Sequence, residues 1–433
     1  MKRLRWIRTS VQKWARRATD RAQRLTRDVV VGMVLSGSVV LCEIGRALNP
    51  LKRAFETILH RLSTNLGDEY VAGEVALVAR DYLADAGRVT WAEYEFVLVD
   101  PTDISKKYGR CMPWLCTVRD ASESRRGAPK LERGWWSCDI VATTEDHRVV
   151  PLHRPIWSTE HPSFRSETDE LRKAMTWVRP FVSPDVTWLM DRGGDGDQRI
   201  ALFDELCRRW TIRMRGDRNV WRPGAEDDGP FNMLEVARAM AKPHKAWCWV
   251  SRDNKLVRVR RRFGCLTVRL DRGGKCYTLV AVERDEDVRD DEPHRPLMLL
   301  TNIVPLSSRE AARLVSAYTR RWGVEDDTRA GKQCLELENI RVLNWPAIVS
   351  LFLLSVIAQG LVALQEARAP RRAARLAAQA PIVDPIPPYR PYRLWMPVQQ
   401  LLLELAVRLR RRRQPRGGLL QRLVAVGGLA ARS

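Results

Sequence analysis

Four side chains in the last third of the chain recur at helical spacing and could act together on a phosphate group. Tyr318, Arg321, Glu325 and Lys332 are separated by three, four and seven residues. Because an α-helix turns about 100° per residue, this spacing places all four on one face. A carboxylate flanked by a phenol, a guanidinium and an ammonium suits a metal ion with phosphates on either side. A solvated charged face with i,i+4 ion pairs gives the same spacing, so the pattern needs partners elsewhere.

Two aspartates earlier in the chain have the setting expected of further metal ligands. Phe96–Val99 is a short apolar run that ends in Asp100, and Val186–Met190 is a second run that ends in Asp191. Each predicts a buried strand that carries a carboxylate at its C-terminal end. With Glu325 on a later helix, three carboxylates could converge on one or two hard cations. An Asp that ends a strand is more commonly a turn residue, so the inference depends on all three together.

The order and spacing of these residues resemble a known family. Tyr-x2-Arg-x3-Glu-x6-Lys, preceded by the two aspartate motifs, is similar to the Y-R-E-K signature of insertion-sequence transposases of the IS-four group, which have a DDE active site. Asp191-Arg192-Gly193 is typical of the second motif, whereas Asp100-Pro-Thr departs from the more usual Asp-Gly-Thr or Asp-Thr-Thr. The resemblance implies an α/β fold, with an RNase H-like catalytic core, a β-rich insertion and an N-terminal helical DNA-binding region.

The same resemblance implies a chemistry. The chain would be a DNA transposase that cleaves the ends of an insertion sequence and joins the 3′-hydroxyl to target DNA by two-metal phosphoryl transfer. Catalysis and the binding of two Mg²⁺ ions, or of Mn²⁺ instead, would fall to the same carboxylates: Asp100, Asp191 and Glu325. Phosphates of the transposon end would be held by Tyr318, Arg321 and Lys332, with Arg192 as a further DNA contact. A DNA-binding relative without chemistry and a metal-dependent nuclease without strand transfer are the alternatives.

Composition favours the same class of partner. The 433 residues include 74 Lys and Arg against 52 Asp and Glu, a net charge of +22. A polyanion is therefore the expected partner, with double-stranded DNA ahead of an acidic membrane. We expect a homodimer on DNA, bound to transposon ends and target. Nine cysteines without a CxxC pair and six scattered histidines predict neither a zinc site nor a disulfide framework, and the expected location is the bacterial cytoplasm, associated with the nucleoid.

Two apolar regions are long enough to raise the question of a signal peptide or a membrane span. Val29–Leu35 and Val39–Cys42 follow a basic start, as in a signal peptide, but the charged region before them is nearly thirty residues long. Ala347–Leu364 is almost long enough to span a bilayer, yet it contains Gln359 and Gly360. We expect a buried helix that covers the sheet, and no membrane contact.

Periodicity and composition divide the chain into five parts. They are an N-terminal helical DNA-binding region (1–88), two parts of the core (89–206 and 296–368) around a β-rich insertion (207–295), and a Pro/Arg-rich C-terminal extension (369–433). In the first part, Ser38 is expected to cap a helix that ends at Leu48, and Asn49-Pro50 to begin a second, over residues 51–66. This is the outline of a helix-turn-helix reader, although ordinary helical domains share it. Its expected DNA contacts are Lys52, Arg53 and Arg61.

The insertion combines arginines with tryptophans. Over Leu256–Phe263 the arginines Arg258, Arg260 and Arg262 alternate with Val257, Val259 and Arg261, which predicts a strand with one basic face. That face could contact a DNA backbone, although solubility also explains it. Trp247 and Trp249 flank Cys248, so on a strand both rings face the same side. In relatives that form hairpin ends such an aromatic stacks on a base turned out of the duplex; two core tryptophans are the alternative.

Overall fold

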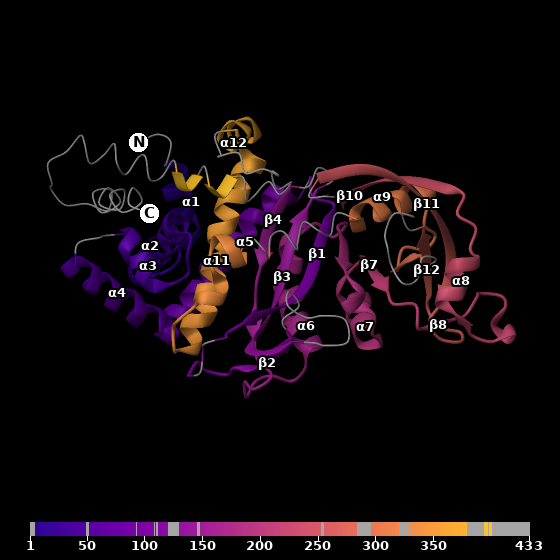
Figure 1. The fold of residues 1–433 in the computed structure, drawn as a ribbon, viewed down its shortest axis with the longest axis horizontal. Helices are drawn as coiled ribbons and strands as arrows, with labels where there is room; N and C mark the ends of the chain where they lie inside the picture. The colour runs from indigo at the N-terminus through magenta and orange to yellow at the C-terminus, as the bar shows by residue number, and fades with distance from the viewer. Residues whose placement is uncertain are drawn as a thin grey trace.

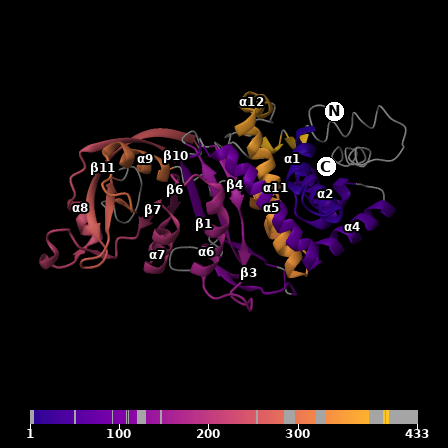
Figure 2. The same ribbon diagram turned by 180° about the vertical axis from the view of Figure 1, so that it is seen from behind.

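The computed structural model places a helical bundle beside one large mixed sheet (Figure 1). It describes residues 5–48, 52–91, 93–107, 109, 111–119, 130–144, 148–252, 255–283, 296–319, 328, 331–378, 394–396 and 398–400. Figure 2 shows the same arrangement from behind, with α5 and α11 lying between the bundle and the strands. This description supports a mixed α/β fold.

The N-terminal part forms five helices: α1 (Arg5–Ala15), α2 (Asp20–Ser36), α3 (Leu41–Leu48), α4 (Lys52–Leu66) and α5 (Glu69–Thr90). Thr19 caps α2 and Asp68 caps α5, each by accepting backbone N–H bonds that the first helical turn leaves unsatisfied. Gly37, at φ 67°, ends α2 in the left-handed conformation that glycine adopts without strain. Ser38 does not cap α3 as expected, because the helix begins at Leu41 and the Ser38 hydroxyl donates to Glu336 at 2.8 Å.

The bundle surrounds α11 (Trp345–Arg368), which α2, α4 and α5 contact. This is the one described helix that is long and apolar enough to cross a membrane; 94% of its most apolar window is buried here, and α2 with α3 passes the same test only as a pair bent by 93°. The prediction of a buried helix is confirmed. Asp85 of α5 joins the two parts, since its buried carboxylate accepts bonds from Lys13 at 2.6 Å, Trp14 at 2.8 Å and Arg368 at 2.6 Å. Burial alone would raise the pKa of Asp85, but these donors outweigh it and hold the pKa below its usual range.

The sheet contains eleven strands. They are β1 (Phe96–Ser105), β2 (Cys116–Arg119), β3 (Leu131–Thr143), β4 (Val149–His153), β5 (Ile156–Trp157), β6 (Thr187–Met190), β7 (Arg209–Met214), β10 (His244–Arg252), β11 (Lys255–Arg269), β12 (Cys276–Val282) and β13 (Leu297–Thr301). The order is β10-β11-β12-β13-β7-β6-β1-β3-β2, with β4 and β5 also paired to β3. Strands β1, β6 and β7 are parallel to one another, and β3 runs antiparallel to β1. The first strand of the segment expected as the insertion (207–295) is β7. It pairs with β6 and continues the parallel set.

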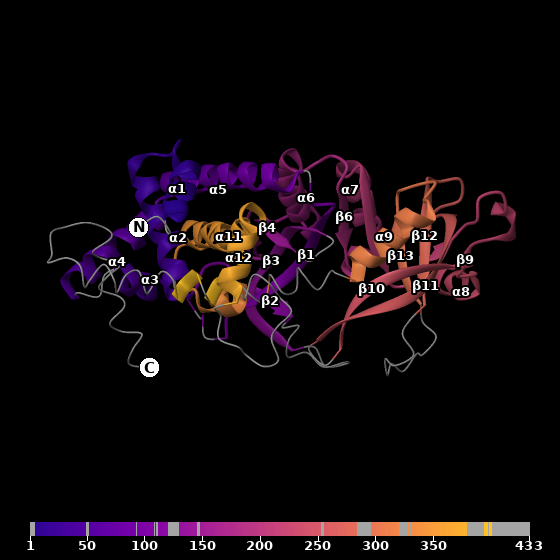
Figure 3. The same ribbon diagram turned by 90° about the horizontal axis from the view of Figure 1, so that it is seen from above.

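Helices cover the parallel strands on both faces. On one side α5, α6 (Glu167–Val178) and α7 (Asp197–Leu206) lie along the strands (Figure 3) and share the main core with Val97 and Val99. On the other side α9 (Ser308–Thr319) packs on Leu98 of β1. The remaining elements are a small β8 (Asn219–Val220) and β9 (Phe231–Asn232) pair, α8 (Met233–Ala239), α12 (Pro370–Ala377) and the short turns η2 (Arg179–Phe181), η3 (Arg192–Gly194), η4 (Glu226–Asp228) and η5 (Leu337–Asn339).

Two elements extend further than the sequence predicts. β1 does not end at Asp100 but continues to Ser105, because β3 pairs with it over the whole length. Pro101, which has no N–H to donate, is tolerated there since the pairing of β1 with β6 stops at Val99. The first residues of the expected C-terminal extension form α12, and Gln399 donates to the carbonyl of Leu35 at 3.0 Å.

Candidate active site

Asp100 and Asp191 occupy matching positions on two neighbouring strands. The parallel register of β1 and β6 runs from Phe96 opposite Thr187 to Val99 opposite Met190, and each aspartate is the next residue. Asp191 keeps an extended backbone, with φ −75° and ψ −171°, so it continues the line of β6. Because paired strands lie about 4.8 Å apart, the two half-buried carboxylates stand side by side.

Both carboxylates point to the side of the sheet that α9 covers. Side chains alternate along a strand, so Asp100 shares a face with Leu98, and Asp191 with Leu189. Leu98 and Leu189 share a buried apolar cluster with Ala317 of α9, whereas Val99 joins the main core on the opposite side. Ala317 is two residues from the C-terminal end of α9. The chain therefore leaves α9 close to the two aspartates and continues toward Glu325 in sequence.

The turn after β6 sets Asp191 apart from the other acid in its motif. The Asp191 side chain accepts a bond from the Gly193 N–H at 2.7 Å and so caps η3. Asp195 has a structural role, because its side chain accepts hydrogen bonds from Arg218 Nε at 3.0 Å and from the Arg215 N–H at 2.7 Å. Arg192 is exposed beside Asp191. Of the two carboxylates in this motif, Asp191 is therefore the better placed for a ligand.

A third carboxylate, Asp139, stands opposite Asp100 on β3. Residues directly opposite in an antiparallel pair share a face, which puts Asp139 on the α9 side as well. Asp139 is buried, pairs with the guanidinium of Arg154 and accepts a hydrogen bond from the hydroxyl of Thr328. Thr328 lies three residues after Glu325 in sequence. Neither Asp139 nor Arg154 was predicted as a site residue; the available indication in the sequence was an Asp inside the apolar run Cys138–Ala142.

Only two residues of the Tyr-Arg-Glu-Lys pattern lie within the described part of the chain. Tyr318 is buried in an apolar cluster with Phe263 of β11 and Val315. The ammonium of Lys332 lies 3.0 Å from a carboxylate oxygen of Glu338 and 3.6 Å from one of Asp103. Arg321 and Glu325 fall outside the described residues, so their shared helical face with Tyr318 and Lys332 stays a prediction.

Lys106 packs next to this pair of ionic contacts. Its ammonium donates to the backbone carbonyls of Glu338 and Ile340, the latter at 2.6 Å. Burial lowers the pKa of Lys106 to about 8, an effect that the nearby Glu338 carboxylate opposes. The end of β1 is thereby fastened to the chain that follows Lys332.

The donor set near Asp100 is suited to a hard cation. Carboxylate oxygens are the protein ligands that Mg²⁺ prefers, and the ion keeps its other positions for water or phosphate. Among the residues described, no group of three His, Cys, Asp or Glu side chains is close enough to hold a metal by itself. Asp100 and Asp191 are therefore two candidate ligands, and the third candidate, Glu325, lies outside the described residues.

The expected DNA contacts of the helical bundle are partly engaged within the protein. Arg61, an expected DNA contact on α4, is half-buried, and its Nη2 lies 2.7 Å from Oδ2 of the buried Asp28 on α2. Arg61 is therefore engaged in an ion pair that ties α4 to α2. Lys52 and Arg53 lie in the first turn of α4, and their side chains are outside the described part.

The β-rich segment has the basic face that the sequence predicts. Arg258, Arg260 and Arg262 are exposed, while Val257, Val259 and Arg261 are partly buried. Trp247 on β10 is 51% exposed and is not a core tryptophan. The guanidinium carbon of Arg258 lies 4.8 Å from the centre of the Trp247 ring, within the range of a cation–π contact. The side chain of Trp249 falls outside the described part.

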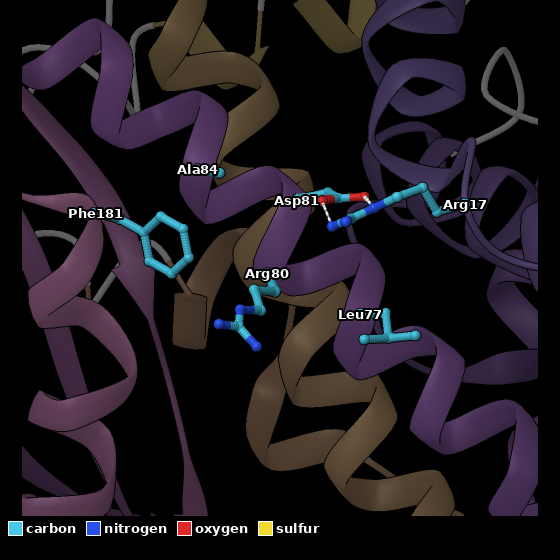
Figure 4. A pocket seen from close by; sticks show the side chains of 6 residues that line it. All are labelled: Arg17, Leu77, Arg80, Asp81, Ala84 and Phe181. Atoms are coloured by element: carbon cyan, nitrogen blue, oxygen red, sulfur yellow. Dashed lines mark hydrogen bonds and ion pairs between the residues drawn. The ribbon is translucent and has the colours of Figure 1, made fainter.

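One open cavity, of about 410 Å³, lies away from the carboxylates. Its lining comes from the turn between α1 and α2, from α5 and from η2, on the side of the sheet opposite α9: Arg17, Leu77, Arg80, Asp81, Ala84 and Phe181. Figure 4 shows Arg17 and Asp81 joined by hydrogen bonds at its edge. This cavity has no residue in common with the candidate site.

Comparisons with known proteins add little to this geometry. No family model and no curated protein matches the chain. Among solved structures, the chain is similar to one in the cryo-EM structure of a piggyBac transposase synaptic complex with hairpin DNA, with a TM-score of 0.44 and 9% sequence identity. The alignment covers 92% of this chain and 76% of that one. A similarity this distant establishes neither a shared fold nor a shared activity.

Proposed function

We propose that the protein is a DNA transposase of the DDE type, with a metal-dependent site formed by Asp100, Asp191 and Glu325. The observation that carries this proposal is the register of β1 and β6, which brings Asp100 and Asp191 side by side on one face of the sheet. The Tyr-Arg-Glu-Lys spacing, which resembles the IS-four group, supplies the third carboxylate. The parallel β1, β6 and β7 with an antiparallel β3 and β4 beside them are the arrangement we propose as an RNase H-like core.

In this proposal each residue near the site has a defined task. Asp100 and Asp191 would share the cation from adjacent strands, and Glu325 would approach from the chain that follows α9. Bound there, two Mg²⁺ ions, or Mn²⁺, would activate an attacking water or 3′-hydroxyl and stabilise the leaving oxygen. Arg321 and the exposed Arg192 would hold phosphates. Lys332 would leave its carboxylate partner Glu338 and bind a phosphate instead. Tyr318, buried on α9, would position that helix.

DNA would be the partner on physical grounds as well. The chain carries a net charge of +22, and a row of exposed arginines runs along β11 beside Trp247. Such a row suits the repeating phosphates of a nucleic-acid backbone, and an exposed indole suits an unstacked base. We propose that this face binds the transposon end, that a homodimer forms on DNA, and that the protein works in the cytoplasm.

A joining assay tests the function. The purified protein would be incubated with Mg²⁺, a plasmid target and labelled DNA duplexes. The duplexes would carry the sequences that flank the gene of this protein. Cleavage at the flank followed by covalent joining to the plasmid is the expected result. Cleavage alone would indicate a nuclease, and binding alone would indicate a DNA-binding relative without chemistry.

A further inference from the structure

A buried ion pair beside the candidate site has no part in the proposed chemistry. Asp139 and Arg154 are each 1% exposed, and Nε of Arg154 donates to Oδ1 of Asp139. Removing two charges from water costs free energy that their mutual attraction does not always repay, so stability alone is a weak reason for such a pair. Asp139 is also the residue opposite Asp100, which places the pair next to the proposed metal ligands.

The other polar atoms of this pair contact two more segments. Oδ2 of Asp139 accepts a hydrogen bond from the hydroxyl of Thr328. Nη1 of Arg154 donates to Oε1 of Gln359 on α11 at 2.6 Å. The pair therefore joins the buried core helix to the stretch of chain that carries Glu325, three residues before Thr328.

Gly331 makes a second contact from the same stretch. A Cβ added there would lie 2.9 Å from Nη1 of Arg154 and 2.9 Å from Cδ1 of Leu337, both too close for a real side chain. Thr328 and Gly331, three residues apart in sequence, therefore both lie against the same buried ion pair.

We propose that Asp139 and Arg154 are positioning residues that dock the Glu325-bearing segment beside β1, an inference that rests on the proposed role of Glu325. Three residues of chain span at most about 11 Å, so docking Thr328 limits how far Glu325 can lie from Asp100. Gln359 holds the guanidinium from the core side. The docking sets the position of the segment and takes no part in phosphoryl transfer.

Variants of Thr328 test the docking without disturbing the buried charges. Thr328→Val keeps the shape of the side chain and removes the hydroxyl, and Thr328→Ser restores it. Thr319→Val is the matched control, because the Thr319 hydroxyl donates to the Ser316 carbonyl of its own helix at 2.8 Å and, within the described residues, to no other segment. Limited trypsin digestion of the full-length protein reports segment opening through cleavage after Arg321 and Arg329. We expect Thr328→Val to accelerate the digestion about tenfold, because it loses one hydrogen bond to a charged group. Thr328→Ser should restore the wild-type rate.

Gly331→Ala gives an independent test of the same contact, since its methyl group would displace the Arg154 guanidinium. It should also accelerate the digestion. In DNA cleavage, Thr328→Val should raise the Mg²⁺ concentration needed for half-maximal rate, and Thr328→Ser should not. Unchanged digestion of both Thr328→Val and Gly331→Ala would overturn the docking. Faster digestion with an unchanged Mg²⁺ requirement would overturn the positioning role. Faster digestion in a protein that never cleaves DNA would support docking and contradict the transposase proposal instead.

Discussion

Asp100 follows Val99 on β1 as Asp191 follows Met190 on β6, and Val99 and Met190 are partners in the parallel register. The two acids are separated by 91 positions in the chain and by one strand spacing in the fold. Both acids come directly after the last pair of this parallel register, so their carboxylates could share a cation. The arrangement also makes definite predictions for residues around the site.

Arg61 should act in folding and not in DNA contact. Arg61→Ala leaves the carboxylate of Asp28, which is 3% exposed, with the partly exposed Arg27 as its one remaining ion-pair partner among the described residues. We expect a loss of about 2 kcal/mol in the free energy of unfolding, measured by urea denaturation. His60→Ala, at an exposed position on the same helix, should change it by less than about 0.5 kcal/mol. If Arg61→Ala kept full stability but bound DNA more weakly, Arg61 would be a DNA contact and not a folding residue.

Trp247 should contribute to binding of unpaired bases. Trp247→Ala removes an exposed ring and should leave the fold intact while weakening affinity for a DNA hairpin by about 1–3 kcal/mol. Trp91→Ala is a matched control, because Trp91 is 50% exposed against 51% for Trp247. Fluorescence anisotropy with hairpin and blunt duplexes would measure both. Equal affinities of Trp247→Ala and wild type for the hairpin would exclude stacking at this position.

Acid should weaken the fold through His153. Burial lowers the pKa of His153 to about 4, and its ring stacks on Trp177 with 6.0 Å between centroids. The unfolded chain takes up the proton near pH 6.5 and the folded chain only near pH 4, so stability is full above pH 6.5 and declines as pH falls through this window. Between pH 7 and pH 5 the loss should be about 2 kcal/mol. His153→Gln should abolish this part of the dependence in denaturant titrations; an identical slope in the variant would refute the assignment.

Gly360 allows α5 and α11 to pack closely. A Cβ at Gly360 would lie 1.8 Å from the hydroxyl oxygen of Tyr82, whose ring is buried. Gly360→Ala should therefore cost about 1–3 kcal/mol or more of unfolding free energy. Gly73→Ala on α5 has nothing within 4 Å and should stabilise by about 0.5–1 kcal/mol, the helical preference of Ala over Gly. Thermal unfolding of the two variants should therefore shift in opposite directions, and a Tm of Gly360→Ala at or above wild type would argue against the close contact.

The helical bundle is also part of the core, which changes how DNA recognition can be tested. Helices α2, α4 and α5 contact α11, and Asp85 of α5 bonds to Arg368 across that boundary. Deleting residues 1–85 would expose an almost wholly apolar helix, so loss of binding by such a truncation would not identify a DNA-reading element. Point substitutions on exposed residues of α4 are the appropriate test.

Apolar patterns predicted the elements better than the contacts between them. The start of β1, all of β6 and the burial of α11 follow from runs that can only be satisfied in a core. The extension of β1 could not be anticipated, because Asp100-Pro-Thr-Asp resembles a turn until β3 supplies its hydrogen bonds. The ion pair of Arg61 was not predicted, because its partner Asp28 is distant in sequence. Asp139 was missed, because nothing in the sequence marks Arg154 as its partner.

The central claim is that Asp100, Asp191 and Glu325 act on DNA through a shared metal site. The measurement that tests it most directly is Mg²⁺-dependent cleavage by Asp100→Asn, Asp191→Asn and Glu325→Gln, each assayed beside DNA affinity. As a control, Asp227→Asn changes a carboxylate that is 92% exposed in an ion pair with Arg272. We predict that each of the three variants loses about a thousandfold or more in cleavage rate and binds DNA at least as tightly as wild type, while Asp227→Asn retains both. Near-wild-type cleavage by any one of the three would remove that residue from the site and contradict the account.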